Sequence, residues 1–385
     1  MIGYWTSQNK GNSANMHIVT DKPYHLFVDT IEPEALHQFE SAMQQPFVVR
    51  GALMADAHTG YSLPIGAVIA TKSVVVPAWV GYDIGCGMCA LPISHTKDVL
   101  TEHAQQIFDQ LYKVIPVGFS HNRHETVWEE AEKIKKTEVL ASIFRKNGLH
   151  QLGSLGGGNH FIEIGTDETG RGWIVIHSGS RGIGHAVATH YMKTASGTGK
   201  AREGHYGLSV QSQEGIHYLK DLHFCLSFGL ENRMEIMRRV VATLCDLVPG
   251  RAFWDERINR NHNHVEHKEG IWIHRKGATH AEKGMMGVIP GNMRDGSFIV
   301  RGKGNPDALY SSSHGAGRVL GRKASKAAIS MADFVKTMKG ITARVAPETL
   351  DESPFAYKDI HHVIEQQSEL IEVIAHITPI INLKG

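Results

Sequence analysis

The sequence predicts an α+β protein, built as a single complex domain in which short β-sheets are flanked by helices. Short apolar runs bounded by glycine recur along all 385 residues, and several longer segments have helical periodicity. Neither an internal repeat nor a linker-like change of composition divides the chain. We therefore expect residues 1–385 to form one domain with a substantial core.

The expected strands are short runs rich in β-branched and aromatic residues, which end at glycine, proline or polar turn residues. The run from Val74 to Val80 is one example, and the run from Trp173 to His177 delivers a histidine into a glycine-containing loop. On this basis we expect strands at 47–50, 64–70, 74–80, 173–177, 271–274, 297–300 and 371–383, and another directly after His160.

The expected helices combine apolar periodicity with signals at their ends. Pro33 suits a first helical turn, and Thr96 is a plausible N-cap. Gly148 is a suitable stop, and Pro249-Gly250 end the longest helical segment. These signals predict helices at 33–44, 96–114, 124–147 and 214–248, a basic helix opened by residues 311–318, and loops at 1–20, 190–211 and 287–292.

Composition restricts the class of function. The net charge of +1 does not indicate general nucleic-acid binding, so any polyanion site must be a local patch. Four cysteines without disulfide spacing favour a reducing, cytoplasmic compartment. There is no recognisable signal peptide and no uncharged apolar run of about 18 residues, so we expect no membrane span. The 40 glycines and 25 histidines point to metal or phosphate chemistry.

Metal-competent side chains stand beside glycines at several expected strand ends. Asp83 and Cys86 lie three residues apart in GYDIGCGM, and His160, His177 and His262 occupy similar settings. A thiol, several imidazoles and a carboxylate suit Mn²⁺, Zn²⁺ or Fe²⁺, and a thiolate can bridge two ions. The alternative is that Cys86 is an inert core thiol in a glycine-rich turn and that Asp83 only caps that turn.

A second polar motif, SSSHGAGR, runs from Ser311 to Arg318. Serine hydroxyls, backbone N–H groups at a helix start and an arginine together would form a phosphate cradle. His314 within it is placed to act as ligand, general acid or nucleophile toward a phosphate. The alternative is a serine N-cap beside an exposed histidine.

Together the motifs resemble those of the RtcB RNA ligases. DAHTGYSLPIG, GYDIGCGM, GGGNHFIE, VIHSGSRG, HNHVEH, RKGA, IPGNM, SSSHGAGR and a final Lys-Gly occur in the family's order from about Met54 to Gly385, while residues 1–50 match weakly. The resemblance implies a GTP- and Mn²⁺-dependent ligase that joins an RNA 3′-phosphate or 2′,3′-cyclic phosphate end to a 5′-hydroxyl end. It further implies a guanylylated histidine, an RNA-3′-pp-G intermediate, a role in tRNA splicing or RNA repair, and a monomer or homodimer.

The resemblance also implies residue roles. The ligands of two Mn²⁺ ions would be Asp83, Cys86, His160, His177 and His262, with Cys86 bridging; His262 is preferred to His264 because Asn263 follows it. His314 would be the guanylylated nucleophile, and Arg181 would lie near the 5′-hydroxyl end of the RNA. Nucleotide contacts would come from Asn159, Glu163, Pro290, Gly291, Asn292, Ser311, His314, Gly315, Ala316, Gly317 and Lys384.

One departure from the family's pattern concerns the guanine-side loop, which reads PGNMRD where PGSMG is common. Asn292 can still form hydrogen bonds there, but Arg294 replaces a glycine. Two other functions remain open. One is a metal-dependent RNA phosphodiesterase or phosphatase on the same scaffold, which would not need His314 or Lys384. The other is a non-catalytic RNA-binding scaffold. Such a protein should have lost Cys86 or His314, and this sequence keeps both.

Overall fold

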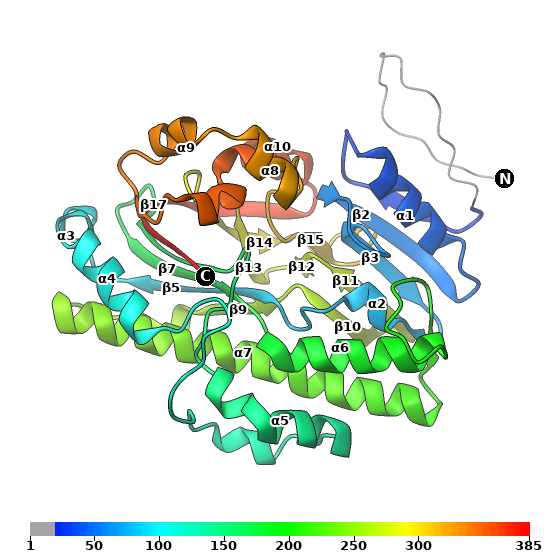
Figure 1. The fold of residues 1–385 in the computed structure, drawn as a ribbon. Helices are drawn as coiled ribbons and strands as arrows, with labels where there is room; N and C mark the ends of the chain where they lie inside the picture. The colour runs from blue at the N-terminus through cyan, green and yellow to red at the C-terminus, as the bar shows by residue number, and fades with distance from the viewer. Residues whose placement is uncertain (1–19) are drawn as a thin grey trace.

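The structure is a computed structural model that describes residues 20–385 (Figure 1). Two large β-sheets lie above one long helix, and shorter helices cover the remaining faces (Figure 1). This mixed arrangement confirms the α+β class. The loop expected at residues 1–20 falls, except for Thr20, outside the described residues.

The larger sheet has eight strands and is nearly closed. Its two end strands, β13 and β9, approach one another, and Arg260 Nε on β9 donates a hydrogen bond to Met286 O on β13 at 3.4 Å. The hydrogen-bonded order is β13 (Met286–Pro290), β14 (Ser297–Gly302), β17 (Ile371–Lys384), β6 (Phe161–Thr166), β7 (Gly172–Ser178), β5 (Gly87–Ile93) and β9 (Ile258–Asn261), with β16 (Thr342–Ala343) beside β17.

The second sheet has five strands, and one of its connections to the first sheet is a single residue. Because β9 ends at Asn261 and the next strand begins at Asn263, His262 is the whole of this connection. The order is β1 (Tyr24–Leu26), β2 (Val48–His58), β3 (Ile65–Thr71), β11 (Ile271–Lys276) and β10 (Asn263–Lys268). Two smaller pairs are β12 (Ala278–His280) with β15 (Ser311–Ser313), and β4 (Val74–Val75) with β8 (Leu208–Ser209).

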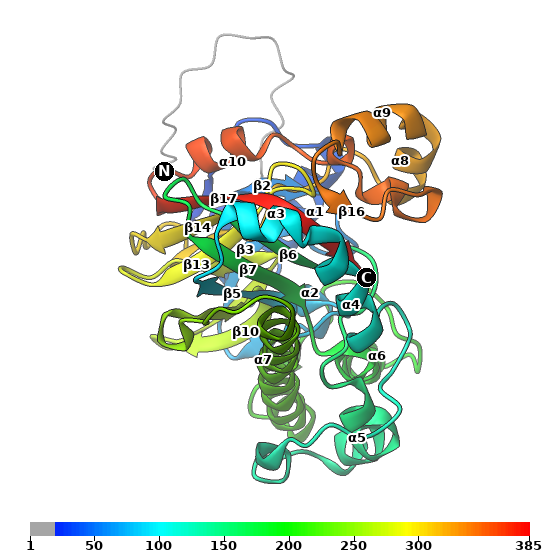
Figure 2. The same ribbon diagram turned by 90° about the vertical axis from the view of Figure 1, so that its left-hand side faces the viewer.

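Helix α7 (Gln213–Leu247) supports the larger sheet. It packs against β5, β7 and β9, with α6 at its side, and Figure 2 shows it nearly end-on below the strands. Ile236, Met237 and Val240 belong to the apolar cluster that covers this sheet, whereas Phe224 and Phe228 pack in a second cluster. The other helices are α1 (Pro33–Met43), α2 (Pro77–Val80), α3 (Lys97–Glu102), α4 (Ala104–Val114), α5 (Glu138–Gln151), α6 (Arg181–Ser196), α8 (Arg322–Ala328), α9 (Met331–Thr337) and α10 (Ile360–Gln366).

Most expected elements are present, including the helix at 33–44, the long helix at 214–248 and the strands at 64–70, 297–300 and 371–383. The helix expected at 96–114 is interrupted at His103. In the described part of the chain, no helix has both the length and the apolar character needed to cross a membrane.

Two expected elements end or begin in the wrong place because of local turn chemistry. The run 74–80 is not one strand, since Pro77 occupies the first turn of α2 and ends β4. The loop expected at 190–211 is wrong over its first part, where α6 continues to Ser196 and ends at Gly197 with φ of 64°.

The helix expected at 124–147 is present from Glu138 onward, as α5, but wrong over its first part. Only a short 3₁₀ turn at Glu129–Glu132 precedes α5, whose N-cap Thr137 accepts a hydrogen bond from Leu140 N at 3.3 Å. Gly148 lies inside α5 rather than at its end. A Cβ there would come within 2.2 Å of the Phe144 ring, so the glycine serves packing rather than helix termination.

Two further expectations fail in the second half of the chain. The loop expected at 287–292 is strand β13 as far as Pro290. No helix opens at residues 311–318, because Ser311–Ser313 form strand β15 and α8 begins only at Arg322.

Arg233 of α7 fastens the helix to the ends of three strands. It is fully buried and donates hydrogen bonds to Asn259 Oδ1 at 2.7 Å, Gly85 O at 2.8 Å, Ser178 O at 2.8 Å and Asn261 Oδ1 at 2.6 Å. The Arg233→Ala change would leave these buried acceptors without a donor. We expect it to lower the free energy of unfolding by about 3 kcal/mol or more.

Urea denaturation measures this effect, and Arg238→Ala is the matched control on the same helix. The Arg238 side chain is 50% exposed and pairs only with Glu231 and Glu235 at the surface, so its loss should cost about 1 kcal/mol or less. Equal costs for the two changes would contradict the role given to Arg233.

Candidate functional site

Four neighbouring strands of the larger sheet bring the predicted ligands to one end of that sheet. His160 precedes β6, His177 lies near the end of β7, Cys86 precedes β5 and His262 follows β9. These strands are adjacent in the order β6-β7-β5-β9 and pair antiparallel, with Phe161 and Met88 both opposite His177. Strand starts and strand ends therefore alternate at the same end of the sheet.

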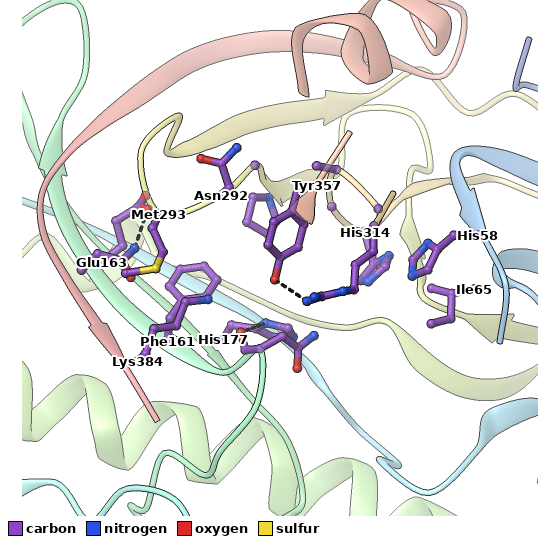
Figure 3. Close-up of a pocket in the computed structure, with 18 of the residues that line it drawn as sticks. His58, Ile65, Phe161, Glu163, His177, Asn292, Met293, His314, Tyr357 and Lys384 are labelled. Atoms are coloured by element: carbon purple, nitrogen blue, oxygen red, sulfur yellow. Dashed lines mark hydrogen bonds between the residues drawn. The ribbon is translucent and has the colours of Figure 1, made fainter. Parts of the chain in front are cut away.

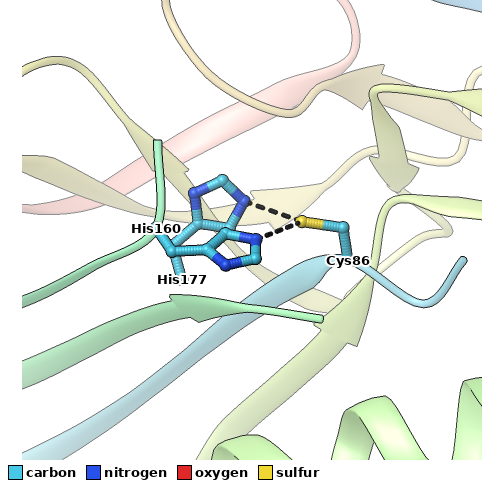
Figure 4. A group of neighbouring side chains, drawn as sticks. All are labelled: Cys86, His160 and His177. Carbon is cyan, nitrogen blue, oxygen red and sulfur yellow. Dashed lines mark hydrogen bonds between the residues drawn. The ribbon is translucent and has the colours of Figure 1, made fainter. Parts of the chain in front are cut away.

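The ligand atoms form a continuous array (Figure 4). Cys86 Sγ lies 3.4 Å from His160 Nε2 and 3.1 Å from His177 Nε2, and Figure 4 shows both imidazoles turned toward the sulfur. His160 Nε2 is 3.1 Å from Asp83 Oδ2 at one end, and His177 Nε2 is 3.3 Å from His262 Nε2 at the other. All five predicted metal ligands thus lie together, and Cys86, His160 and His177 are close enough to hold one ion.

The protonation of this array suits a metal ion. Burial lowers the pKa of His177 and of His262 well below the usual value, so both rings are neutral at pH 7. His160 Nδ1 and His177 Nδ1 face the backbone oxygens of Leu155 at 2.9 Å and Asn159 at 3.2 Å. These contacts leave each Nε2 lone pair directed toward the array, as in metal-binding histidines.

Cys86 and Asp83 complete the donor set. Burial and the nearby Asp83 carboxylate raise the pKa of the Cys86 thiol well above its usual value. Burial also opposes ionisation of Asp83, but the hydrogen bond and charge of His160 outweigh it and lower the pKa of that carboxyl. A bound cation would offset the cost of a buried thiolate, so thiol, imidazoles and carboxylate together fit a soft-to-intermediate divalent metal such as Mn²⁺ or Zn²⁺.

His314 lies beside the array, next to the five-stranded sheet. Its ring centroid lies 4.7 Å from that of His262, and its Nδ1 lies 2.6 Å from Asp56 Oδ2. Asp56 is fully buried on β2, and it also accepts a hydrogen bond from the His314 backbone N–H at 3.2 Å. The carboxylate holds the proton on Nδ1 and leaves Nε2 as a free lone pair.

A cavity of about 240 Å³ opens beside His314 (Figure 3). Figure 3 shows His314 and His58 at one end of the cavity and Glu163 and Lys384 at the other, with Tyr357 between them. The cavity is lined by His58, Ile65, Asn159, Phe161, Glu163, His177, Pro290, Gly291, Asn292, Met293, His314, Gly315, Ala316, Gly317, Arg318, Arg322, Tyr357, Asn382 and Lys384.

The far end of this cavity is buried and charged. Lys384 Nζ lies 2.9 Å from Glu352 Oε2 and 5.1 Å from the centroid of the Phe161 ring. Burial raises the pKa of Glu163 to about 8, against the effects of Ser297, Lys384 and Asn382. Within residues 20–385, the buried Glu163 Oε1 and Asn382 Oδ1 have no hydrogen-bond partner. Both atoms suit a ligand that brings N–H donors.

Most residues predicted to bind the nucleotide line the cavity, but Ser311 does not. It is buried in β15, where its hydroxyl accepts from Arg275 Nε at 2.8 Å and donates to Leu309 O at 2.9 Å. The serine-rich cradle at a helix start is therefore wrong, although Gly315, Ala316 and Gly317 do border the cavity.

The loop that departs from the family's pattern is ordered by its own side chains. Asn292 Oδ1 accepts hydrogen bonds from the backbone N–H groups of Arg294 and Asp295, both at 3.0 Å. Arg294 is exposed and pairs with Asp295 Oδ1 at 2.8 Å, so it points away from the cavity that Asn292 lines.

Arg181 lies next to the metal-competent array rather than in the cavity. It has φ of 59° at the start of α6, and its guanidinium donates to Gly118 O at 3.0 Å. A Cβ on Gly156 would meet both this guanidinium, at 2.1 Å, and His160 Nδ1, at 2.6 Å. His264, by contrast, faces Arg275 at 3.1 Å and stacks on His280, outside the array.

The sequence interpretation gave no role to several residues that shape the site. Asp56 and His58 were visible as an acid and a histidine two apart in DAHTGY, and burial lowers the pKa of His58 to about 4. Glu352 and Tyr357 carried no such signal, yet Tyr357 Oη donates to Glu352 Oε2 at 2.6 Å and Arg318 packs on the Tyr357 ring at 5.0 Å.

Comparison with known proteins adds an independent finding. The family model described as "tRNA-splicing ligase RtcB" matches residues 38–385. The chain is 35% identical to the RNA-splicing ligase RtcB of Escherichia coli K12, over 92% of this chain and 95% of that protein. It is 28% identical to the tRNA-splicing ligase RtcB of Pyrobaculum aerophilum, over 89% and 90% respectively. It is also 29% identical to the RNA-splicing ligase RtcB of Mycobacterium bovis, over 88% and 98%.

The two cysteines of the C-x-x-C allow a matched test of metal binding. Cys86→Ala should weaken Mn²⁺ binding by about 100-fold or more, because the central donor of the array is lost. Cys89→Ala should change it less than about twofold, because Cys89 lies on β5 with its side chain in an apolar cluster. Isothermal titration of both variants gives the comparison. An equal loss in the two variants would mean that general packing, not ligation, is affected.

Proposed function

The chain belongs to the RtcB family of RNA ligases, and from this premise we propose that it seals RNA with GTP and Mn²⁺ as cofactors. The RNA substrate carries a 3′-phosphate or 2′,3′-cyclic phosphate on one end and a 5′-hydroxyl on the other. The physiological setting is tRNA splicing or RNA repair, in a reducing cytoplasmic compartment where Cys86 stays a thiol. Residues 1–385 act as one catalytic domain, as a monomer or homodimer.

The observation that carries the proposal is the placement of His314. Its Nδ1 is held by Asp56 at 2.6 Å, its ring lies against His262, and it lines the cavity. An imidazole fixed in this way is a nucleophile at Nε2 when neutral and a good leaving group when protonated. Asp56 stabilises the imidazolium-like charge that appears when Nε2 forms a bond.

The reaction then has three steps at phosphorus. His314 Nε2 forms a bond to the α-phosphorus of GTP, and the bond to the β-phosphate oxygen breaks to release pyrophosphate. A 2′,3′-cyclic phosphate end must first react with water, which breaks the P–O2′ bond and leaves a 3′-phosphate and a 2′-hydroxyl. The GMP group then passes from His314 to the RNA 3′-phosphate, which frees the imidazole and makes the RNA-3′-pp-G intermediate. The 5′-hydroxyl attacks the activated phosphorus and GMP leaves. Arg181, beside His160, is placed to orient the RNA end at which this attack occurs.

The residues that would hold the metal ions are Asp83, Cys86, His160, His177 and His262, and Cys86 would be shared by two ions. When bound, the ions would supply positive charge that neutralises the triphosphate and the phosphates of the RNA end. The chain contributes a preorganised donor set in which His177 and His262 are neutral, because burial lowers the pKa of both.

The guanine base would occupy the end of the cavity near Glu163 and Lys384. A carboxylate accepts hydrogen bonds from the guanine N1–H and amino groups, and Lys384 can donate to the O6 oxygen. The Phe161 ring under Lys384, together with Tyr357, offers apolar surface for the base. Asn159, Pro290, Gly291 and Asn292 border the remaining nucleotide.

A phosphodiesterase or phosphatase is the alternative enzyme, and it would use the metal array without a covalent relay. It leaves unexplained both the Asp56–His314 pair and the buried Lys384–Glu352 pair at the end of the cavity. A non-catalytic scaffold leaves the same features unexplained. The ligase accounts for all of them.

His314→Ala should abolish labelling of the protein by α-³²P-GTP and Mn²⁺, while Mn²⁺ affinity stays within about twofold of wild type. The adduct of the wild type should be labile in acid and stable in alkali, as expected for a phosphoramidate. Cys86→Ala should lose both metal binding and the adduct. An unlabelled wild-type protein that binds GTP and Mn²⁺ would refute the ligase proposal.

Glu163 makes guanine binding depend on pH. Its pKa of about 8 means that the free carboxyl is largely protonated at pH 6.5, and guanine requires the ionised form. GMP affinity should therefore rise with pH, by up to tenfold per unit below pH 8, and level off above it. Fluorescence titration gives the GMP affinity of wild type and of Glu163→Gln at each pH. The ratio of the two affinities removes the effect of titrating the nucleotide phosphate, which is the same for both proteins. A pH-independent ratio would contradict the assignment.

A further inference from the structure

Phe119 is a large aromatic residue placed entirely in solvent. Its side chain is 100% exposed, although the chain on both sides of it is well anchored. Before it, Gly118 N donates to Gly156 O at 2.9 Å, and after it, Asn122 N donates to His150 O at 2.9 Å. Single exposed apolar side chains are common on protein surfaces, so the exposure of Phe119 gains its meaning from the groups that lie around it.

The anchors of this loop lead directly to the metal-competent array. Gly156 belongs to the glycine-rich segment that ends at His160, and a parallel bridge pairs Val117 with Gly156. The Arg181 guanidinium, which lies beside Gly156, donates to Gly118 O at 3.0 Å. The ring of Phe119 is therefore held one residue away from a direct contact of Arg181.

The surface between the ring and the array includes two exposed glycines, Gly157 and Gly158. A Cβ on Gly157 would meet only the Gly118 Cα, at 3.5 Å, whereas a Cβ on Gly158 would meet the Arg322 guanidinium, at 3.1 Å. A polymer that crosses these glycines therefore meets backbone at Gly157 and a cationic side chain beside Gly158. Such a strip suits close approach of a nucleic-acid backbone.

The loop is polar around the ring. His121, Arg123 and His124 are all exposed, and the first acidic residue after Phe119 is Glu125. A protein-docking surface would surround Phe119 with further apolar side chains, but the residues that follow it are Ser120, His121 and Asn122. An exposed aromatic ring close to an arginine is one element of a single-stranded nucleic-acid platform.

We propose that Phe119 stacks on a base of the RNA strand whose end reaches the metal-competent array, with Arg123 and Arg181 contacting the phosphates on either side. This inference rests on the proposed RNA ligation and names one of its substrate contacts. Phe119 is a binding residue and takes no part in the transfer of GMP, because its ring lies on the outer surface.

The test measures the affinity of single-stranded RNA with a 3′-phosphate for wild type, Phe119→Ala, Phe119→Trp and Phe119→Leu. Stacking on one base is worth about 1–3 kcal/mol, so Phe119→Ala should bind about 5- to 150-fold more weakly. Phe119→Trp should bind within about twofold of wild type, and Phe119→Leu should resemble the alanine variant. The slope of affinity against salt concentration should stay unchanged, because no charge is removed.

Ile216→Ala is the control for loss of an exposed apolar side chain. Ile216 is 51% exposed, and it lies on α7 about 24 Å along the axis from Asn232, which contacts Ser154 in the glycine-rich region. Its RNA affinity should equal that of wild type. Thermal unfolding of each variant checks that the fold is intact.

Guanylylation separates failure of this inference from failure of the proposed function. With GTP and Mn²⁺ alone, Phe119→Ala should form the His314 adduct at the wild-type rate. If Phe119→Ala binds RNA within twofold of wild type, the inference is overturned and the ligase proposal stands. The same holds if Phe119→Ala loses guanylylation and RNA binding together. A wild-type protein without guanylylation would instead refute the ligase, whatever Phe119 does to RNA binding.

Discussion

The structure depends on keeping a cluster of neutral, metal-competent side chains buried between two sheets. Cys86, His177 and His262 lose most of their contact with water, and burial keeps the thiol and both imidazoles in their neutral forms. Such groups are costly inside a protein unless their remaining polar atoms are satisfied. The surrounding chain meets this requirement with backbone carbonyls that face Nδ1 of His160 and of His177, and with the buried Arg233 that ties three strand ends to α7.

The same constraint explains why the site lies where the two sheets meet. His262 is both a member of the array and the single residue between β9 and β10. Asn263, directly after it, donates to Asp83 O at 3.1 Å and accepts from Gly277 N at 2.8 Å. The metal-competent edge of the larger sheet is thereby locked to the smaller sheet, which carries Asp56. Any shift of one sheet against the other would move His314 relative to His262.

This geometry separates two kinds of chemistry within one cavity. The thiol and imidazoles at the strand ends suit metal ions, whereas the Asp56–His314 pair suits covalent attack at phosphorus. The opposite end of the cavity uses buried charge for recognition, since Lys384 faces Glu352 and Glu163 retains an unpaired oxygen. Each part of the site therefore has its own supporting residues.

The sequence by itself determined the residue types and their local settings. Glycine-flanked Cys86, His160 and His177 stood out because chemistry-bearing side chains beside flexible backbone are a local feature, and the strong apolar periodicity of the long helix made α7 predictable. Tertiary structure decided which strands are neighbours, because hydrogen-bond pairing between distant segments leaves no trace in a single sequence. It therefore decided the order Asp83, His160, Cys86, His177, His262. It also moved Ser311 out of the site, since pairing of β15 with β12 overrode the helix-start pattern, and it brought Asp56 to His314 across more than half of the chain.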